Sequence, residues 1–309
     1  MQRLVLTGGL GFIGSNLIRN AQNKFDILVI DNGMYGEKNL ELLDFDINYK
    51  KFDIANTHQI ASLLEVEDVI VHLAARGNVV ESVQDPILNL HSNVLTTLSL
   101  LEAMRIANCK KIIFSSTGGA LMGNAKPPVN ESTNPSPISP YGASKLSCEG
   151  YLNAYANSYG IRSIILRFGN VYGPFSLHKK GVINHFIKSS INNQKVDVYD
   201  SLETTRDYIH VDDICRGILL SVRSLLSNDN LKSIFHLSNG REVSIDEIIK
   251  VISTLSGKEL QHSILPPRKG EVIRNCSDFT LAKNKLGFQP QVRLEDGVKN
   301  LYNWLENFM

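Results

Sequence analysis

Short apolar runs alternate with segments of helical spacing through the first half of the chain. Continuous apolar runs at residues 4–6, 27–30, 69–75, 111–114 and 163–168, with a less regular one ending near 53–54, are typical of strands buried in a parallel sheet. Apolar residues of segment 93–107 follow a helical spacing, and segment 141–156 is long enough for several helical turns. The alternation predicts an α/β fold with a doubly wound parallel sheet.

The rhythm changes after residue 174. We expect a helix over 181–193, a strand-like segment near 205–211, a helix over 214–226, a strand at 234–237 and a capped helix that begins at 244–245. Asp212 and Asp213 precede the third of these elements. They could form a catalytic carboxylate pair, but acids also stabilise a helix start, and we favour that interpretation.

Three glycines follow the first strand. Gly8, Gly11 and Gly14 fit a G-x-x-G-x-x-G pattern that leads directly into a helix. Backbone N–H groups at a helix start bind anions, and the missing side chains let a pyrophosphate approach. Asp31 ends the second strand, where a carboxylate can hold the ribose hydroxyls of NAD and repel the 2′-phosphate of NADP. The alternative for Asp31 is a cap at the strand end.

Small residues end the fourth strand. Leu73, Ala74 and Ala75 leave room for a cofactor over the sheet edge. His72 lies in the same apolar run, and we expect a hydrogen-bonded core residue rather than a ligand.

Tyr141 and Lys145 are four residues apart, so a helix places them on one face. Ser139 can cap this helix, and Pro140 suits its first turn. A neighbouring ammonium would lower the pKa of the phenol toward neutrality and make it a general base. An ordinary helix with an unrelated Tyr and Lys is the alternative. Thr117 ends the fifth strand and can face the same crevice.

Composition excludes several classes of protein. The 309 residues carry a formal net charge of +1, which argues against nucleic-acid binding, and no apolar run approaches the ~20 residues of a membrane span. The N-terminus lacks a signal-peptide pattern. The four scattered cysteines form no C-x-x-C, so we expect no metal site and reduced thiols in a cytoplasmic protein.

Jointly these motifs resemble the extended short-chain dehydrogenase/reductases, in their NAD-dependent nucleotide-sugar epimerase/dehydratase branch. The resemblance rests on residues 7–14, Asp31, 53–54, 72–75, Asn93, 115–117, Tyr141-x-x-x-Lys145, 167–174 and 206–213. It implies a Rossmann domain over 1–174, rejoined by about 209–237, and a smaller substrate-binding lobe within 175–309. It also implies bound NAD, with further contacts from Phe12, Ile13, Asn32, Asp53, Ile54, Asn93, Ser115, Tyr141, Lys145 and Phe168.

Within this family, Thr117 is followed by Gly118-Gly119, where dehydratases carry an acidic pair. The pattern looks like the 4-epimerases of UDP-hexoses, which act through a transient 4-keto sugar. The resemblance assigns Thr117, Tyr141 and Lys145 to catalysis. It assigns substrate binding to Thr117, Asn170, Arg206, Arg268 and Asn275, although each arginine could instead form a surface ion pair. A medium-sized Asn275 would admit an N-acetyl group.

Other functions stay open at this stage. A UDP-glucuronate epimerase, a 4-ketoreductase or a dehydratase would use the same fold, and a non-enzymatic NAD-binding module would be expected to lack Tyr141 or Lys145. The resemblance further implies a homodimer that pairs helices 93–107 and 141–157. The chain departs from the family pattern at three places. A glycine turn is usual at 200–203, Met122 replaces a Tyr, and Arg76 stands where an uncharged polar residue is common.

Overall fold

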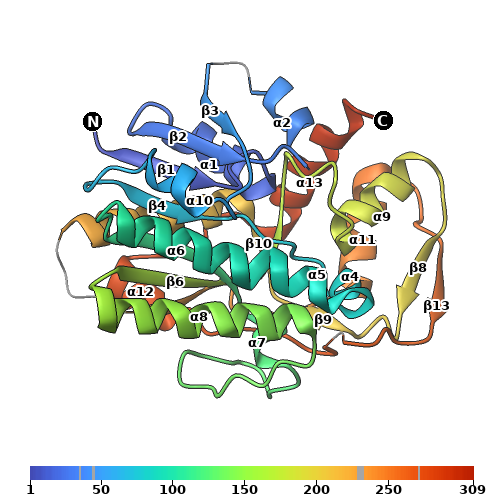
Figure 1. The fold of residues 1–309 in the computed structure, drawn as a ribbon. Helices are drawn as coiled ribbons and strands as arrows, with labels where there is room; N and C mark the ends of the chain where they lie inside the picture. Colours follow the sequence, from blue (N-terminus) through green and yellow to red (C-terminus); the bar gives the residue numbers. More distant parts are fainter. Residues whose placement is uncertain (35, 44–45, 228–232, 271) are drawn as a thin grey trace.

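A parallel sheet of seven strands forms the centre of the computed structural model (Figure 1), which describes residues 1–34, 36–43, 46–227, 233–270 and 272–309. The strand order is β11-β6-β5-β4-β1-β2-β3, and all neighbours are parallel. The strands are β1 (Arg3–Thr7), β2 (Asp26–Asp31), β3 (Asn48–Lys51), β4 (Val69–His72), β5 (Lys111–Thr117), β6 (Arg162–Phe168) and β11 (Ser233–Leu237). The predicted doubly wound sheet is confirmed. Strand β3 ends at Lys51, so Asp53 and Ile54 follow the strand rather than end it.

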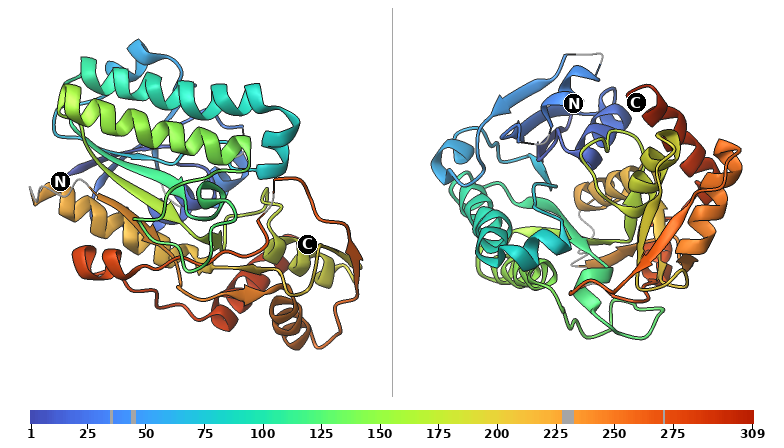
Figure 2. Two further views of the ribbon diagram at one scale, coloured as in Figure 1. Left: turned by 90° about the horizontal axis from the view of Figure 1, so that it is seen from below. Right: turned by 90° about the vertical axis from the view of Figure 1, so that its right-hand side faces the viewer.

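Helices cover both faces of this sheet, as Figures 1 and 2 show. On one face, α1 (Phe12–Ala21), α10 (Val211–Leu226) and α12 (Thr280–Leu286) pack over one hydrophobic cluster. On the other face, α3 (Thr57–Ala61), the π-helical turn η1 (His91–Leu95), α6 (Thr96–Ile106) and α8 (Pro140–Tyr159) enclose a second cluster. Short helices join these elements: α2 (Glu37–Glu41), α4 (Val79–Gln84), α5 (Pro86–Leu90) and α7 (Gly119–Met122).

The later part of the chain builds a third hydrophobic cluster beside the sheet. It includes residues of α9 (Val182–Ile191), β8 (Val196–Tyr199), α11 (Ile245–Ser256) and α13 (Leu294–Glu306). Strand β13 (His262–Leu265) pairs with β8. Two small pairs, β7 (Asn170–Tyr172) with β10 (Tyr208–His210) and β9 (Thr205–Arg206) with β12 (Val243–Ser244), lie at the junction. Strand β11 then returns to the main sheet beside β6.

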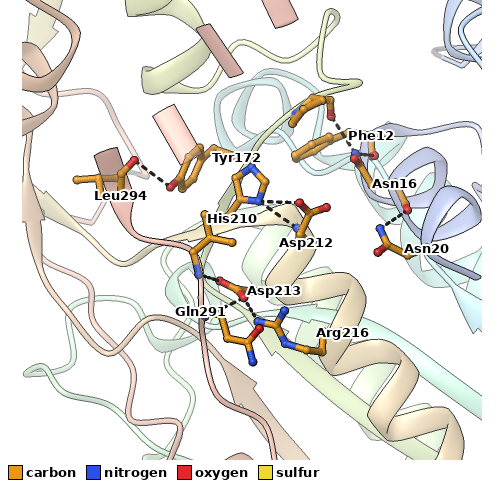
Figure 3. A network of polar contacts seen from close by, with 12 residues as sticks. Phe12, Asn16, Asn20, Tyr172, His210, Asp212, Asp213, Arg216, Gln291 and Leu294 are labelled. Atoms are coloured by element: carbon orange, nitrogen blue, oxygen red, sulfur yellow. Dashed lines mark hydrogen bonds and ion pairs between the residues drawn. The ribbon is translucent and has the colours of Figure 1, made fainter. Parts of the chain in front are cut away.

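The start of α10 is tied to the C-terminal segment by a polar network (Figure 3). The buried carboxylate of Asp213 accepts hydrogen bonds from the backbone N–H groups of Gln291 and Val292 and pairs with Arg216. His210 is the N-cap residue, and Asp212 lies in the first turn. The acids therefore stabilise a helix start, as expected, although the helix begins three residues earlier than the sequence indicated.

Two predictions from the sequence are confirmed: the cap of α8 by Ser139 and the hydrogen-bonded position of His72 in the core. The Ser139 hydroxyl caps α8 by accepting a hydrogen bond from the N–H of Gly142. His72 is buried and bonded on both ring nitrogens, to Thr7 at 2.6 Å and to Thr97 at 3.0 Å. Burial lowers the His72 pKa to about 3, so the ring stays neutral.

Two of the three departures from the family pattern have local explanations. Asp200 takes the left-handed conformation, with φ of 72°, in place of the usual glycine, which a short polar side chain tolerates. Its carboxylate accepts a hydrogen bond from Thr204, which holds the turn. Met122 is buried against Leu121 and Val129.

Candidate active site

A cavity of about 1650 Å³ opens at the carboxyl ends of the strands, where an open α/β sheet places its ligands. Its walls come from the loops after β1, β2, β4 and β5 and from the third cluster, including α9 and β8. Ligand pockets are typically about 300–1,000 Å³, so this one has room for a dinucleotide and a second molecule together.

The glycine turn is built for close approach of an anion. Gly8 has φ of 69°, and a Cβ there would lie 2.6 Å from the Ala74 backbone. A Cβ on Gly14 would lie 2.4 Å from the carbonyl oxygen of Gly9, so only glycine lets α1 pack against the turn. No side chain within the described residues caps the start of α1, and its first N–H groups remain directed at the cavity edge.

Asp31 stands at the cavity wall at the end of β2. Its carboxylate accepts hydrogen bonds from the N–H groups of Gly33, at 2.8 Å, and Leu10, at 3.1 Å. Burial raises the pKa of Asp31, and these two hydrogen bonds oppose the rise. The residue therefore combines the local turn role with a position suited to a ribose.

The structure brings most of the predicted site residues together on this wall. These are Gly8, Gly11, Phe12, Ile13, Gly14, Asp31, Asn32, Asp53, Ile54, Leu73, Ala74, Ala75, Thr117, Tyr141, Phe168, Asn170, Arg206, Arg268 and Asn275. Asn93, Ser115 and Lys145 are not among the wall residues. The Asn93 amide lies behind the wall, where its oxygen accepts the N–H of Arg76 at 2.8 Å and its nitrogen donates to Ser144.

Thr117 and Tyr141 meet at the cavity. Their side chains are hydrogen bonded, although 23 residues, among them the short helix α7, separate them in the sequence. The backbone N–H of Tyr141 also donates to the Ser82 hydroxyl at 3.2 Å, which fixes the first turn of α8. Burial raises the Tyr141 pKa to about 12, and the Thr117 hydrogen bond opposes that rise.

The raised pKa of Tyr141 is opposite to the expectation that the phenol pKa lies near neutrality beside Lys145. Lys145 is 3% exposed, and its ammonium donates to the Ser115 carbonyl oxygen at 2.8 Å and lies 4.7 Å from the centre of the Phe114 ring. Burial lowers the Lys145 pKa to about 8. The rise in the Tyr141 pKa therefore follows from the desolvation of the phenol.

Gly118 and Gly119, which follow Thr117, lie close to other side chains. A Cβ on Gly118 would lie 3.1 Å from the Ser277 hydroxyl oxygen and 3.2 Å from Nδ1 of His236. A Cβ on Gly119 would lie 2.9 Å from the side-chain nitrogen of Asn275. Acidic side chains at these two positions would have to displace buried neighbours, so the wall beside Thr117 is shaped for glycine.

The predicted substrate-binding residues line the other half of the cavity. Asn170 lies on β7, and Arg206 donates to the carbonyl oxygens of Thr205 and Ile273. The guanidinium of Arg268 stacks 3.4 Å from the centre of the Tyr199 ring. Guanidinium groups suit a diphosphate because their forked donors can bind two oxygens.

Sequence reasoning missed two contacts at this site. Tyr199 supports Arg268, and Ser82 supports Tyr141. The alternation of Val196, Asp197, Val198 and Tyr199 signalled a strand, but its cavity-facing side depends on the pairing of β8 with β13. Ser82 comes from a short helix with no motif.

These residues fit NAD as a cofactor. The open helix start, the two glycines without room for a Cβ and Asp31 at the wall provide sites for a pyrophosphate and an adenosine ribose. Together with the fold they define a Rossmann-type NAD-dependent enzyme, whose cavity also holds Thr117 and Tyr141.

The comparisons with known proteins give the family. Residues 4–234 match the model of the NAD dependent epimerase/dehydratase family, and the chain belongs to that family. It is similar to the UDP-glucose 4-epimerase of Thermotoga maritima, solved with UDP-glucose, at 32% identity, TM-score 0.91 and 99% coverage of each chain.

Two further solved structures are similar over the whole chain. One is a UDP-N-acetylglucosamine 4-epimerase from Methanobrevibacter ruminantium, at 30% identity and TM-score 0.91, covering 100% of this chain and 99% of that one. The other is a UDP-glucuronic acid 4-epimerase from Bacillus cereus, solved with UDP-glucuronic acid and NAD, at 27% identity, TM-score 0.93 and 100% coverage of both chains. The chain is therefore an NAD-dependent enzyme of the epimerase type.

Within the described residues, no helix combines the length and the apolar character that crossing a bilayer requires. The four cysteines, Cys109, Cys148, Cys215 and Cys276, are free and buried, as expected.

Proposed function

We propose that the protein interconverts the C4 epimers of a UDP-sugar. The observation that carries this proposal is the hydrogen-bonded pair of Thr117 and Tyr141 on the wall of a cavity with room for both a dinucleotide and a nucleotide sugar. Bound NAD supplies a reversible hydride acceptor, which makes a transient 4-keto sugar accessible.

Each residue has a defined part in this proposal. Tyr141 removes the proton from the sugar 4-hydroxyl and later returns it, and Thr117 hydrogen-bonds the same oxygen. Lys145 provides a positive charge behind the phenol. Arg206 and Arg268 hold the diphosphate, so the keto sugar can turn about that anchor and present its other face.

Epimerisation is favoured over dehydration by the glycine pair. Elimination of water needs an acid beside the reacting carbon, and positions 118 and 119 carry no side chain. The tight contacts that a Cβ would make with Ser277 and Asn275 support the same choice. A 4-ketoreductase remains the second candidate because it would use the same Thr117, Tyr141 and Lys145.

The test is incubation with UDP-glucose, UDP-N-acetylglucosamine and UDP-glucuronate without added reductant, followed by separation of the C4 epimers. Tyr141→Phe should lower turnover by about 10²–10⁴. Tyr151→Phe is the matched control, because Tyr151 lies on the same helix but is 41% exposed and away from the cavity. Near-normal turnover in Tyr141→Phe would remove the basis of the proposal, and stoichiometric loss of NADH would identify a reductase.

We further propose that the sugar pocket accepts an N-acetyl group. Asn275 is 4% exposed at the wall, and its side-chain oxygen has no hydrogen-bond partner among the described residues. A residue of this size leaves more room than an aromatic one. Asn275→Tyr should therefore reduce turnover of UDP-N-acetylglucosamine far more than that of UDP-glucose; equal losses would contradict this assignment.

We also propose a homodimer through the helices of the α6 and α8 face. Leu95 and Ile106 on this face are 43% and 48% exposed, and Tyr151 and Tyr159 on α8 are 41% and 45% exposed. Apolar side chains gathered on two adjacent helices are typical of an interface. Sedimentation should give a dimer that Leu95→Glu converts to a monomer, and a monomeric wild type would contradict it.

A further inference from the structure

A row of polar side chains crosses the sheet directly beneath the catalytic residues. Ser116 on β5, Arg167 on β6 and His236 on β11 are neighbours in the strand register, so they point to the same face. This face carries α8, whose Glu149 reaches down to the row. All four side chains are buried.

The carboxylate of Glu149 joins three elements. One oxygen accepts hydrogen bonds from the Ser116 hydroxyl at 2.6 Å and from Nε of Arg167 at 3.1 Å, and the other accepts Nη2 of Arg167 at 2.7 Å. The two charged side chains are only 5% and 3% exposed. The pair thus ties α8 to the ends of β5 and β6 in a place that water does not reach.

Glu149 also shares a helix face with the catalytic pair. Tyr141, Lys145 and Glu149 follow one another at steps of four residues along α8. On the strand side, Ser116 stands between Ser115, whose carbonyl oxygen holds the Lys145 ammonium at 2.8 Å, and the catalytic Thr117. Glu149 therefore contacts the residue that lies between the hydrogen-bond partner of Lys145 and Thr117.

The charge on Lys145 depends on what surrounds it. Burial lowers its pKa to about 8, and Cys148 and Glu149 on its own helix oppose the lowering. The Cys148 thiol is itself kept neutral because burial raises its pKa. From β4, His72 faces the ammonium as a neutral ring with a pKa of about 3.

From β5, Phe114 presents its ring to the ammonium and Ser115 its carbonyl oxygen. Arg167 on β6 adds a second buried cation, which Glu149 pairs directly. Glu149 is therefore a buried carboxylate one helical turn from Lys145 on α8, and it is paired with Arg167.

We propose that Glu149 is a positioning residue for the catalytic edge: it fixes α8 against β5 through Ser116 and Arg167, and it supplies the negative charge that keeps the Lys145 ammonium protonated. The kinetic part of this inference rests on the proposed epimerase function. The electrostatic part concerns the folded chain alone and can be measured without substrate.

The first experiment uses pH profiles of turnover in the NAD-loaded enzyme. Glu149→Gln leaves Arg167 buried and unpaired, so the double variant Glu149→Gln/Arg167→Met is made alongside it to preserve folding. Glu149→Gln is compared with the wild type, and the double variant with Arg167→Met, because each pair differs only in the charge at Glu149. Within each pair the basic limb of the kcat profile should move to lower pH by about one unit on loss of that charge, with little change in KM. Limbs that coincide between Arg167→Met and the folded double variant would overturn the charge role.

A matched control separates this effect from stability. Asp68 is a buried carboxylate paired with Arg3 at the opposite end of the sheet. Asp68→Asn should lower the unfolding midpoint and leave the basic limb in place. Ser116→Ala removes only the link to β5 and should lower kcat about tenfold without moving the limb; unchanged kcat would overturn the positioning role.

The second experiment needs no activity. The free energy of unfolding is measured against pH for Arg167→Met and for Glu149→Gln/Arg167→Met, each with and without Lys145→Met, because these chains differ only in the charge at Glu149. The stability that the chain gains when folded Lys145 loses its proton should begin at lower pH in the double variant. The same onset in both would overturn the inference. A wild type that epimerises no UDP-sugar would instead overturn the proposed function and leave this measurement valid.

Discussion

Replacing Lys145 by Met should remove a rise in the free energy of unfolding with pH. The burial of the lysine determines the sign of this rise. The side chain is 3% exposed, and its pKa falls from 10.5 to about 8 on folding. Below pH 8 the lysine is protonated in both folded and unfolded chains, and the folded chain bears the full cost of burying the charge. Between pH 8 and 10.5 the unfolded chain binds the proton and the folded chain does not, so stability rises with pH.

The size of this change follows from the shift. Each pKa unit corresponds to about 1.36 kcal/mol, so the wild type should gain about 3 kcal/mol relative to Lys145→Met between pH 7 and pH 10.5. The lost hydrogen bond to the Ser115 carbonyl oxygen adds a constant difference of about 1 kcal/mol that does not vary with pH. The pH-dependent part is therefore separable from the structural part.

The assay is urea unfolding at closely spaced pH values, with the free energy of unfolding taken from each curve. Leu146→Met is the control, because it changes a partly buried neighbour on the same helix and no titratable group. Its difference from the wild type should be constant across the range. A Lys145→Met difference that is also constant would refute the assignment of a buried, destabilising charge at this position.

Three further outcomes are expected. Gly14→Ala should abolish retention of NAD on purification, since its Cβ would lie 2.4 Å from the Gly9 carbonyl oxygen. A normal NAD content would contradict the assignment of the glycine turn as the pyrophosphate site. Asp31→Asn should narrow the preference for NAD over NADP, measured as the ratio of dissociation constants, because the repulsion of a 2′-phosphate is lost. Gly119→Ala should lower the free energy of unfolding by about 1–3 kcal/mol through contact with Asn275, and Asn275→Ala in the same chain should restore much of it.

The parts of the site that the sequence predicted are those determined by interactions between residues close together in the chain. Gly8 and Gly14 stand between a buried strand and a helix, so their role follows from a turn whose geometry spans few residues. The cap at Ser139 and the common face of Tyr141 and Lys145 follow from helix periodicity.

Other features depend on contacts between distant elements, which no local pattern encodes. The wall does not include Asn93, because its amide is used by Arg76 and Ser144 from two other elements. The Tyr141 pKa moved opposite to expectation, since desolvation is set by everything packed around the phenol. The pairing of Arg268 with Tyr199 arises only once β13 lies beside β8.

The return of β11 to the edge of the main sheet has a practical consequence for engineering. The chain leaves that sheet after β6, builds α9 and β8, comes back through α10 and β11, and departs again toward α11 and α13. A chimera that exchanges sugar preference between relatives must therefore graft at several junctions, because fusing one protein's front half to another's back half would split the β6–β11 pair between parents.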